Sequence, residues 1–240
     1  MKSISYYKNY LVQHKIKRIL QRAPGLYIKI QLLRYSGKRY KRKIVVPDSQ
    51  IVIEGYPRSA NSFSVKAFKH ANGDDYKIAT HLHVFPQVVL GVKYNIPTLV
   101  LIRNPFDCIS SYAALRAQTY GLNKFEKGNN IAWLLDDYVF FYENLKPYKG
   151  KFVMAEFSDV LKDYGAILTA VNKKYNSNFI AFDHTSEHVK EVFSSAKSHL
   201  SPSKDRDQIK ALYLEQMQEL TSSKAYKQAL SLFEFWTNSN

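Results

Sequence analysis

The stretch that decides the fold is residues 51–63, IVIEGYPRSANSF, in which an apolar run meets small polar residues through a glycine, a proline and an arginine. Residues 51–54 predict a short strand, and residues 61–71 predict a helix capped by Ser59 or Asn61. A helix that begins directly after a strand turns unpaired amides and the positive end of its dipole toward the turn. With the forked cation of Arg58, the stretch predicts a site for a phosphate-like or sulfate-like anion.

A second stretch has the same arrangement. In TLVLIRNPFDCISSYAAL, residues 98–115, an apolar strand again ends at an arginine, Arg103, and a helix over 106–117 follows. Ser110 and Ser111 come one to two helical turns after Arg103, so an arginine and a hydroxyl can converge on a second anion. Two anion sites at the carboxyl ends of two parallel strands indicate a nucleotide with phosphates at both ends.

Strands alternate with helices along most of the chain. We predict further strands over 76–84 and 151–157, helices over 86–94, 130–145, 164–175 and from about 206 to 235, and a polar loop over 195–208. This order predicts an α/β fold. The expected architecture is a single domain, residues 46–240, with a central, mainly parallel sheet flanked by helices.

Basic residues are concentrated at the N-terminus. Residues 1–43 contain 13 Lys and Arg and no Asp or Glu, whereas the remaining 197 residues hold 22 basic and 20 acidic side chains. We predict a basic arm, residues 1–45, made of a helix over 4–22 and a hairpin of strands 26–35 and 40–46 around a turn at 36–38. Such an arm favours an anionic neighbour, either an acidic glycan or a membrane surface that it contacts peripherally, and nucleic acid is not expected. Dimerisation through the arm and a plain solvated surface are the alternatives.

The cysteine content bounds the redox environment. Cys108 is the single cysteine, which excludes an internal disulfide and indicates a reducing, cytoplasmic location. Its apolar flanks predict a packing role. No stretch of the sequence is long and apolar enough to span a membrane.

Two motifs together resemble a known family. The nucleotide motifs of the sulfotransferase superfamily resemble two stretches of this chain. The first is Tyr56-Pro57-Arg58-Ser59. The second is Arg103-Asn104-Pro105-Phe106-Asp107, with Ser111 eight positions after Arg103. The likeness covers roughly residues 50–175. It implies a P-loop-NTPase-like sulfotransferase fold and the donor 3′-phosphoadenosine 5′-phosphosulfate. It also implies transfer of the sulfuryl group to an acceptor hydroxyl or amine, for example on a glycan, with release of adenosine 3′,5′-bisphosphate and no metal ion.

The resemblance implies roles for single residues. Arg58 contacts the 5′-phosphosulfate and stabilises charge on the bridging oxygen, while Arg103 and Ser111 hold the 3′-phosphate. The other implied nucleotide contacts are Ser59, Ala60, Asn61, Ser62, Phe63, Phe157, Lys204 and Arg206.

The chain also departs from the family pattern. Arg58 and Ala60 replace the lysine and glycine of the cytosolic branch, and the arginine resembles the Golgi tyrosylprotein branch and bacterial relatives. The Arg-Lys-Gly loop that closes over the 3′-phosphate is missing, and Lys204 and Arg206 are the basic residues available to replace it.

The candidate general base lies in IATHLHVFPQVVL, residues 78–90. His81 and His83 are two apart on a predicted strand, so both side chains are expected on one face. His83 fits the family's catalytic histidine, which precedes a helix that begins with proline, and Thr80-His81-Leu82 fits a rival alignment. We prefer His83 as the base, with His81 as the alternative. His184 and His188 are predicted to be surface residues of a helix.

Two other functions stay open at this point. A kinase-like phosphotransferase would need magnesium and a carboxylate beside the turn, for which Glu54 and Asp107 are candidates, although the Walker lysine is missing. A degenerate domain that binds a polyanion through the basic arm would show affinity that falls steeply with salt and no turnover.

Overall fold

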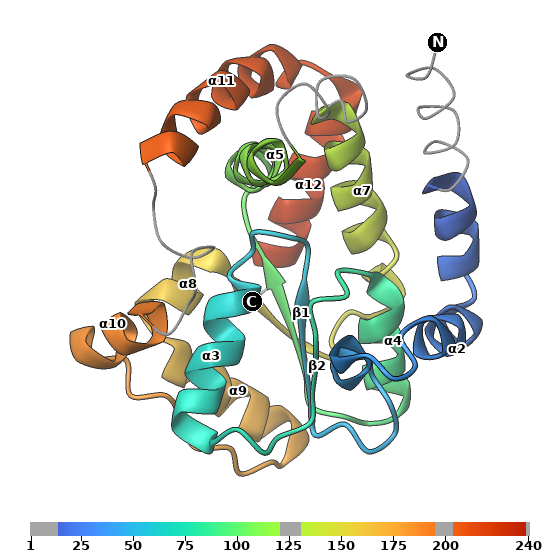
Figure 1. Ribbon diagram of the computed structural model, residues 1–240, viewed down its shortest axis with the longest axis vertical. Coiled ribbons are helices and arrows are strands. Elements are labelled where there is room, and N and C mark those ends of the chain that lie inside the picture. The colour runs from blue at the N-terminus through green and yellow to red at the C-terminus, as the bar shows by residue number, and fades with distance from the viewer. Residues whose placement is uncertain (1–13, 121–130, 195–203, 239–240) are drawn as a thin grey trace.

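The structure is a computed structural model that describes residues 14–120, 131–194 and 204–238. At its centre lies a four-stranded, all-parallel sheet in the order β2-β1-β3-β4 (Figure 1). The strands are β1 (Ile51–Gly55), β2 (Ile78–Thr80), β3 (Thr98–Ile102) and β4 (Val153–Glu156). The predicted α/β class with a parallel sheet flanked by helices is confirmed.

Helices cover both faces of this sheet. They are α2 (Pro24–Arg34), α3 (Asn61–Asn72), α4 (Phe85–Lys93), α5 (Pro105–Tyr120), α7 (Ile131–Glu143), α8 (Phe157–Lys162), α9 (Tyr164–Tyr175), α10 (Ser186–Ser194), α11 (Lys204–Leu220) and α12 (Lys224–Thr237). Short 3-10 helices η1 (Arg39–Lys43) and η2 (Lys146–Tyr148) and a helical segment over 14–21 complete the described elements.

The alternation of side chains along the strands builds the core on two sides. Ile53 and Leu101 point into a cluster with α3, α9 and α10. Val100 and Ile102 point into a cluster with α4, α5, α7, α11 and α12. Every residue of β1 and β3 is buried, as expected for the inner strands of a parallel sheet with helices on both faces. Because the strands are parallel, the turns after β1, β2 and β3 meet at one edge of the sheet.

The predicted hairpin in the arm is wrong. Residues 24–34 form α2, and residues 39–43 form η1. Pro24 stands in the first turn of α2, where a helix tolerates it, and the buried residues Tyr27, Ile28 and Gln31 are spaced for one helix face. That face packs in a cluster with β1 and α4, so residues 24–45 share the core of the rest of the chain. The helix predicted over 4–22 is present over 14–21, and residues 4–13 lie outside the described part.

The second strand is shorter than predicted. It ends at Thr80, because His81 and His83 adopt left-handed backbone angles, with φ 57° and φ 52°, that a strand cannot contain. In addition, α8 was not predicted, and α11 begins at Lys204, inside the segment predicted as a loop.

Candidate functional site

The turn after β1 is built from two left-handed residues. Arg58 and Ala60 have φ values of 73° and 71°, and Ala60 is the N-cap of α3. The predicted side-chain cap is wrong, because no side chain caps α3. The Asn61 side-chain amide instead donates to the Tyr56 carbonyl at 3.0 Å. Ser64 makes the first i to i−4 bond of the helix, so the amides of residues 61–63 precede the helical ladder at the edge of the sheet.

Buried contacts hold this turn in place. The Tyr56 amide donates to the Tyr142 hydroxyl at 3.3 Å, and the Tyr56 hydroxyl donates to the Leu134 carbonyl at 2.9 Å. The Cys108 thiol donates to the Pro57 carbonyl at 3.1 Å. Burial raises the pKa of Cys108 to about 11, so the thiol stays protonated at neutral pH and packs rather than reacts. These contacts fix the turn over residues 56–60, which is called the platform below.

The two arginine motifs meet at this platform. Arg58 Nε donates to Ser111 Oγ at 2.9 Å, and Arg103 Nη1 donates to the Arg58 carbonyl at 3.2 Å. The Arg103 guanidinium lies 4.0 Å from the centre of the Phe157 ring, a cation–π contact. Arg58, Arg103, Ser111 and Phe157 thus gather at the carboxyl ends of neighbouring strands β1, β3 and β4, where open α/β sheets bind ligands.

A buried carboxylate anchors the histidine segment. Glu54 is fully buried in β1 and accepts from the backbone amides of Leu82 at 2.6 Å and His83 at 3.2 Å. It also accepts from the Gln87 side-chain amide at 2.9 Å and from the Gly55 amide at 3.1 Å. Burial raises the pKa of Glu54, and His83 and the backbone donors oppose the rise. Sequence reasoning considered Glu54 only as a magnesium ligand and missed this role.

The two histidines have different surroundings. His81 Nε2 lies 3.0 Å from Ser62 Oγ and His81 Nδ1 lies 2.9 Å from Thr80 Oγ1, so both ring nitrogens have a hydroxyl partner. Burial, helped by His83 and Lys43, lowers the pKa of His81 to about 3. His81 is therefore neutral at pH 7 and a weak proton acceptor.

The His83 ring is better placed to accept a proton. Its Nδ1 lies 2.8 Å from the Gly55 carbonyl oxygen and 3.6 Å from Glu54 Oε2. A carbonyl oxygen only accepts, so Nδ1 carries the hydrogen and Nε2 carries the lone pair. The side chain is 26% exposed, and its ring centre lies 5.6 Å from that of His81. The expectation that both residues lie on one strand is wrong, since they follow the strand, but they remain neighbours.

The remaining predicted residues lie elsewhere. The Phe63 ring is 2% exposed and packs among Tyr164, Phe182 and Phe193, so it belongs to the core. Ser59 is fully buried, with its hydroxyl 3.6 Å from the Cys108 sulfur. Lys204 and Arg206 stand in the first turn of α11, and their side chains lie outside the described part. A groove of about 660 Å³ beside α9 is lined by His184 and Phe182 among others, and none of the predicted nucleotide residues lines it.

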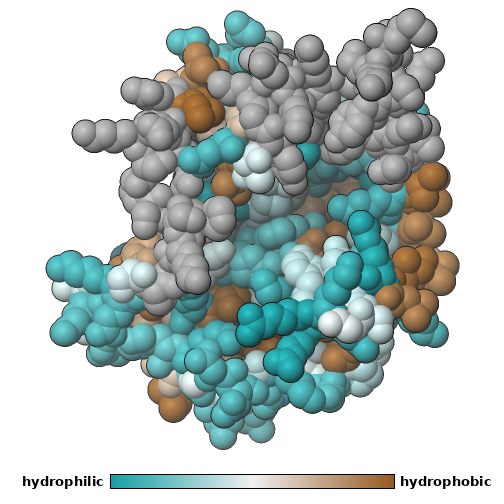
Figure 2. All heavy atoms as spheres, viewed as in Figure 1, coloured by the Kyte–Doolittle hydropathy of each residue, from teal (hydrophilic) through white to brown (hydrophobic). Residues whose placement is uncertain are grey.

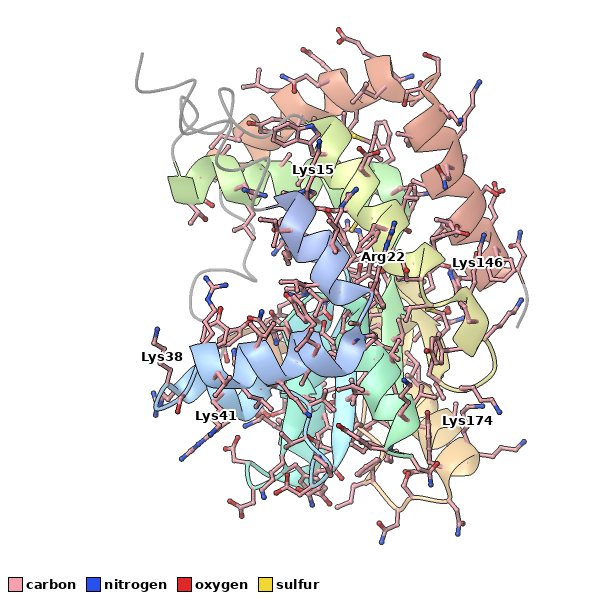
Figure 3. The ribbon with its side chains drawn as sticks, turned by 90° about the vertical axis from the view of Figure 1, so that its right-hand side faces the viewer. Lys15, Arg22, Lys38, Lys41, Lys146 and Lys174 are labelled. Carbon is pink, nitrogen blue, oxygen red and sulfur yellow. The ribbon has the colours of Figure 1, made fainter. Side chains whose placement is uncertain are left out.

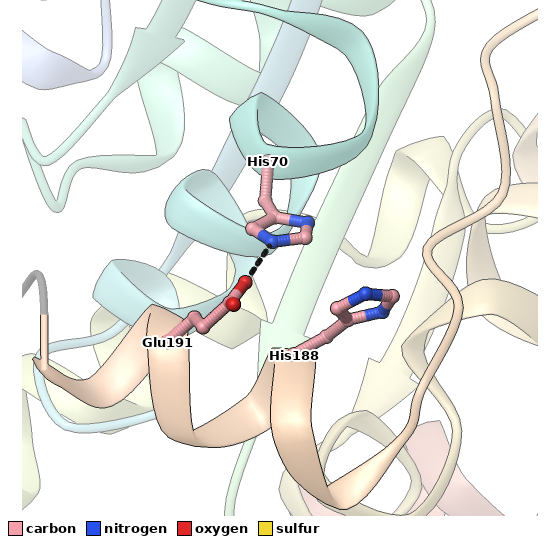
Figure 4. A group of neighbouring side chains, drawn as sticks. All are labelled: His70, His188 and Glu191. Atoms are coloured by element: carbon pink, nitrogen blue, oxygen red, sulfur yellow. Dashed lines mark hydrogen bonds and ion pairs between the residues drawn. The ribbon is translucent and has the colours of Figure 1, made fainter.

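A cluster between α3 and α10 contains ligands suited to a metal ion. His70 Nε2 lies 2.8 Å from Glu191 Oε2, and His188 lies beside them (Figure 4). One ligand atom of each residue lies within 4.8 Å of the others. His188 lies in α10, as predicted. The prediction that His184 also belongs to this helix is wrong, because His184 precedes α10 in an irregular segment, where its Nδ1 accepts from the Tyr164 amide at 3.0 Å.

Comparison with known proteins adds no assignment: no protein-family model and no curated protein matches the chain. Within the described residues, no helix combines the length and the apolar character needed to cross a bilayer.

Proposed function

We propose that the chain is a sulfotransferase that moves a sulfuryl group from 3′-phosphoadenosine 5′-phosphosulfate to an acceptor hydroxyl or amine. The observation that carries the proposal is the convergence of two arginine-bearing strand–turn–helix units, with Arg58 Nε 2.9 Å from Ser111 Oγ. Such a pair of cationic turns on neighbouring parallel strands fits a nucleotide with phosphates at both ends. The resemblance of both motifs to sulfotransferases supports sulfuryl transfer over other uses of such a nucleotide.

The roles follow the contacts. Arg103, resting on Phe157, and Ser111 would bind the 3′-phosphate. Arg58 and the amides of residues 61–63 would bind the 5′-phosphosulfate at the N-terminus of α3. The acceptor oxygen or nitrogen bonds to sulfur while the bond from sulfur to the bridging phosphate oxygen breaks. Arg58 neutralises the charge that develops on that oxygen, and the acceptor proton passes to His83 Nε2.

The kinase-like alternative has weaker support. It requires a carboxylate beside the turn to hold magnesium. Both oxygens of Glu54 accept hydrogen bonds in the core, where they fix the histidine segment. Asp107 is exposed in the first turn of α5. The oxygens of Glu54 are therefore already used in the core, and Asp107 follows the Arg103 turn rather than the turn after β1.

Calorimetric titration with adenosine 3′,5′-bisphosphate tests the proposal. We expect metal-free binding with a dissociation constant of about micromolar or below. Adenosine 5′-monophosphate should bind at least about tenfold more weakly, because it lacks the 3′-phosphate that Arg103 holds. Arg103→Ala should weaken bisphosphate binding by about 10- to 100-fold, a typical loss for a charge-assisted contact, while Arg22→Ala, at an exposed arginine of the arm, should leave it unchanged.

The opposite outcomes are equally clear. A preference for ATP with magnesium over the bisphosphate would replace the sulfotransferase by the kinase-like function. Binding of no nucleotide would leave a domain whose basic arm binds a polyanion. Equal losses in Arg103→Ala and Arg22→Ala would mean that nonspecific charge, rather than this site, attracts the nucleotide.

A further inference from the structure

Exposed apolar side chains gather on the basic arm. Among the described residues, eight large hydrophobic side chains are exposed, and four of them lie within residues 16–33: Ile16 at 51%, Ile19 at 65%, Leu26 at 53% and Leu33 at 77%. Figure 2 shows brown atoms along the right-hand edge, where Figure 1 places the 14–21 helix and α2. Half of the exposed large apolar side chains therefore sit on one short part of the chain.

On α2 these side chains form a stripe. Leu26, Lys29 and Leu33 are spaced i, i+3 and i+7, which places them on one side of the helix. Tyr27, Ile28 and Gln31 face the core on the other side. The outer side of an ordinary amphipathic helix is polar, whereas the outer side of α2 carries leucines as well as charges.

Positive charge surrounds the leucines. Figure 3 faces this surface and labels Lys15, Arg22, Lys38 and Lys41 of the arm, with Lys146 and Lys174 on the same side of the molecule. The arm contains no Asp or Glu before Asp48, so its cations are not balanced within it. Among the described ion pairs of the arm, Arg18 and His14 contact Asp137 of α7, which fixes the 14–21 helix to the body of the protein.

We propose that the 14–21 helix, α2 and η1 form a docking face for an anionic lipid bilayer. Cations near a bilayer surface are attracted to anionic headgroups, and leucine and isoleucine side chains enter the boundary between headgroups and acyl chains. A soluble polyanion such as an acidic glycan would use the cations but gain nothing from the exposed leucines. The apolar stripe among the cations therefore favours the bilayer.

The docking face also adjoins the histidine segment. The Tyr40 hydroxyl of η1 donates to the His81 carbonyl oxygen, and the Gln87 side-chain amide donates to the Lys43 carbonyl at 3.2 Å. Docking through η1 would bring His83 near the bilayer, which points to an acceptor presented at the membrane surface. This last step rests on the proposed function, whereas bilayer binding does not.

Cosedimentation with vesicles tests the docking face. The full chain should bind vesicles in which phosphatidylglycerol replaces part of the phosphatidylcholine, bind pure phosphatidylcholine weakly, and lose affinity as salt rises. The double variant Leu26→Ser/Leu33→Ser should bind the anionic vesicles about 10- to 100-fold more weakly, because two apolar side chains no longer insert. The matched control Ile180→Ser/Leu212→Ser replaces side chains outside the arm that are 64% and 54% exposed, and it should bind as the wild type does.

Three results would overturn the docking face. The first is equal binding by both double variants. The second is tight binding to a soluble sulfated polysaccharide with no binding to vesicles, which would assign the arm to a polyanion. The third is a dimer in solution that Leu26→Ser/Leu33→Ser dissociates, which would assign the stripe to a second copy of the chain. Nucleotide titration of the same variants distinguishes failure of the docking face from failure of the proposed function, because the serine variants leave the nucleotide turn intact.

An independent observation concerns His70, His188 and Glu191. His188 and Glu191 are one turn apart on α10, and His70 reaches them from the last turn of α3. His188 Nδ1 lies 2.9 Å from the Asp183 carbonyl oxygen, so Nδ1 carries the hydrogen and Nε2 carries the lone pair. A metal-binding histidine usually has its other nitrogen oriented in this way.

We infer that these three residues form a site for zinc or a similar divalent transition metal. Two imidazoles and one carboxylate are a ligand set of zinc sites, and they suit magnesium or calcium poorly. The three ligand atoms lie within 4.8 Å of one another, and because His70 and Glu191 are exposed their side chains can close on one ion. The metal would replace the hydrogen bond between His70 and Glu191, with the imidazole proton moving to Nδ1. It would clasp α10 to α3, whose rings Phe193 and Phe63 already pack 5.5 Å apart.

Titration of the untagged, chelator-treated protein with zinc tests this site. We expect one zinc per chain with a dissociation constant of about micromolar or below, and at least about tenfold weaker binding in His188→Ala and in Glu191→Gln. Calcium should not compete. His81→Ala should leave zinc binding unchanged. The site would be refuted by no zinc binding, by equal binding in His188→Ala, or by loss of zinc in His81→Ala, which would move the metal to the other histidine pair.

Discussion

Replacing Arg58 with alanine is expected to slow cleavage of 3′-phosphoadenosine 5′-phosphosulfate by about 10²- to 10³-fold, the cost of removing one donor that stabilises charge in a transition state. The leaving phosphate oxygen gains charge as its bond to sulfur breaks, and Arg58 supplies a permanent cation at the N-terminus of α3. Release of adenosine 3′,5′-bisphosphate from the donor reports the effect without knowledge of the acceptor. The same variant should bind the bisphosphate product only about two- to tenfold more weakly, because the product lacks the sulfuryl group whose transfer Arg58 assists.

Arg103→Ala and Lys66→Ala are the control variants for the expected effect of Arg58→Ala on donor cleavage and bisphosphate binding. Arg103→Ala should show the opposite balance, with a large loss of bisphosphate affinity, since its cation lies over Phe157 at the predicted 3′-phosphate site. Lys66→Ala removes a cation from α3 about one turn beyond the platform and should change neither quantity. If Arg58→Ala and Arg103→Ala lowered affinity equally and left donor cleavage per bound donor unchanged, both arginines would act in binding alone, and the assigned role of Arg58 would be wrong.

The parallel sheet could be predicted from the sequence because its strands and helices have distinct patterns. Thr98–Ile102 and Tyr164–Tyr175 begin and end at the predicted residues. A continuous apolar run of five residues between a proline and an arginine allows little else than a buried strand. The meeting of Arg58 and Ser111 also follows from the sequence, because parallel strands place their following turns at one edge.

The arm was predicted wrongly because the spacing of its apolar residues fits both the two-residue period of a strand and the 3.6-residue period of a helix. Residues 26–35, LYIKIQLLRY, contain isoleucines and leucines that fit a strand, yet burial falls on Tyr27, Ile28 and Gln31, which only a helix brings to one side. A polar glutamine at a buried position hid that helical spacing. Tertiary packing against α4 and β1 decided between the two periods.

The histidine segment shows what local patterns cannot supply. The segment in which His81 and His83 have left-handed φ values is held by Glu54, which lies 27 residues earlier than His81 in the chain and accepts from the Leu82 and His83 amides. The sequence gives one hint, an acidic residue inside an apolar strand, since such a residue is buried only with partners. Without the register of β1 against β2, the identity of those partners is unknown.

Glu54→Leu is expected to lower the free energy of unfolding by about 3–5 kcal/mol, because it leaves several buried donors without an acceptor. The carboxylate accepts from the amides of Gly55, Leu82 and His83 and from Gln87. Urea unfolding followed by circular dichroism measures the change. Glu156→Leu is the matched control: Glu156 also belongs to a strand of the sheet but is only partly buried, so its replacement should cost less than about 1 kcal/mol.

The pH dependence of the free energy of unfolding distinguishes the effect of the Glu54 charge from the effect of its size and hydrogen bonds. Burial raises the pKa of the folded carboxyl, so the unfolded chain releases this proton at a lower pH than the folded chain does. The wild type should therefore lose stability relative to Glu54→Gln as pH rises from about 4.3, the ordinary pKa of glutamate, through the raised folded value. A flat difference in the free energy of unfolding between the two proteins over this range would mean that the donors fully offset burial of the charge.

A Glu54→Leu variant as stable as the wild type would show that the histidine segment keeps its left-handed turns without Glu54, and the assigned anchor would then be wrong.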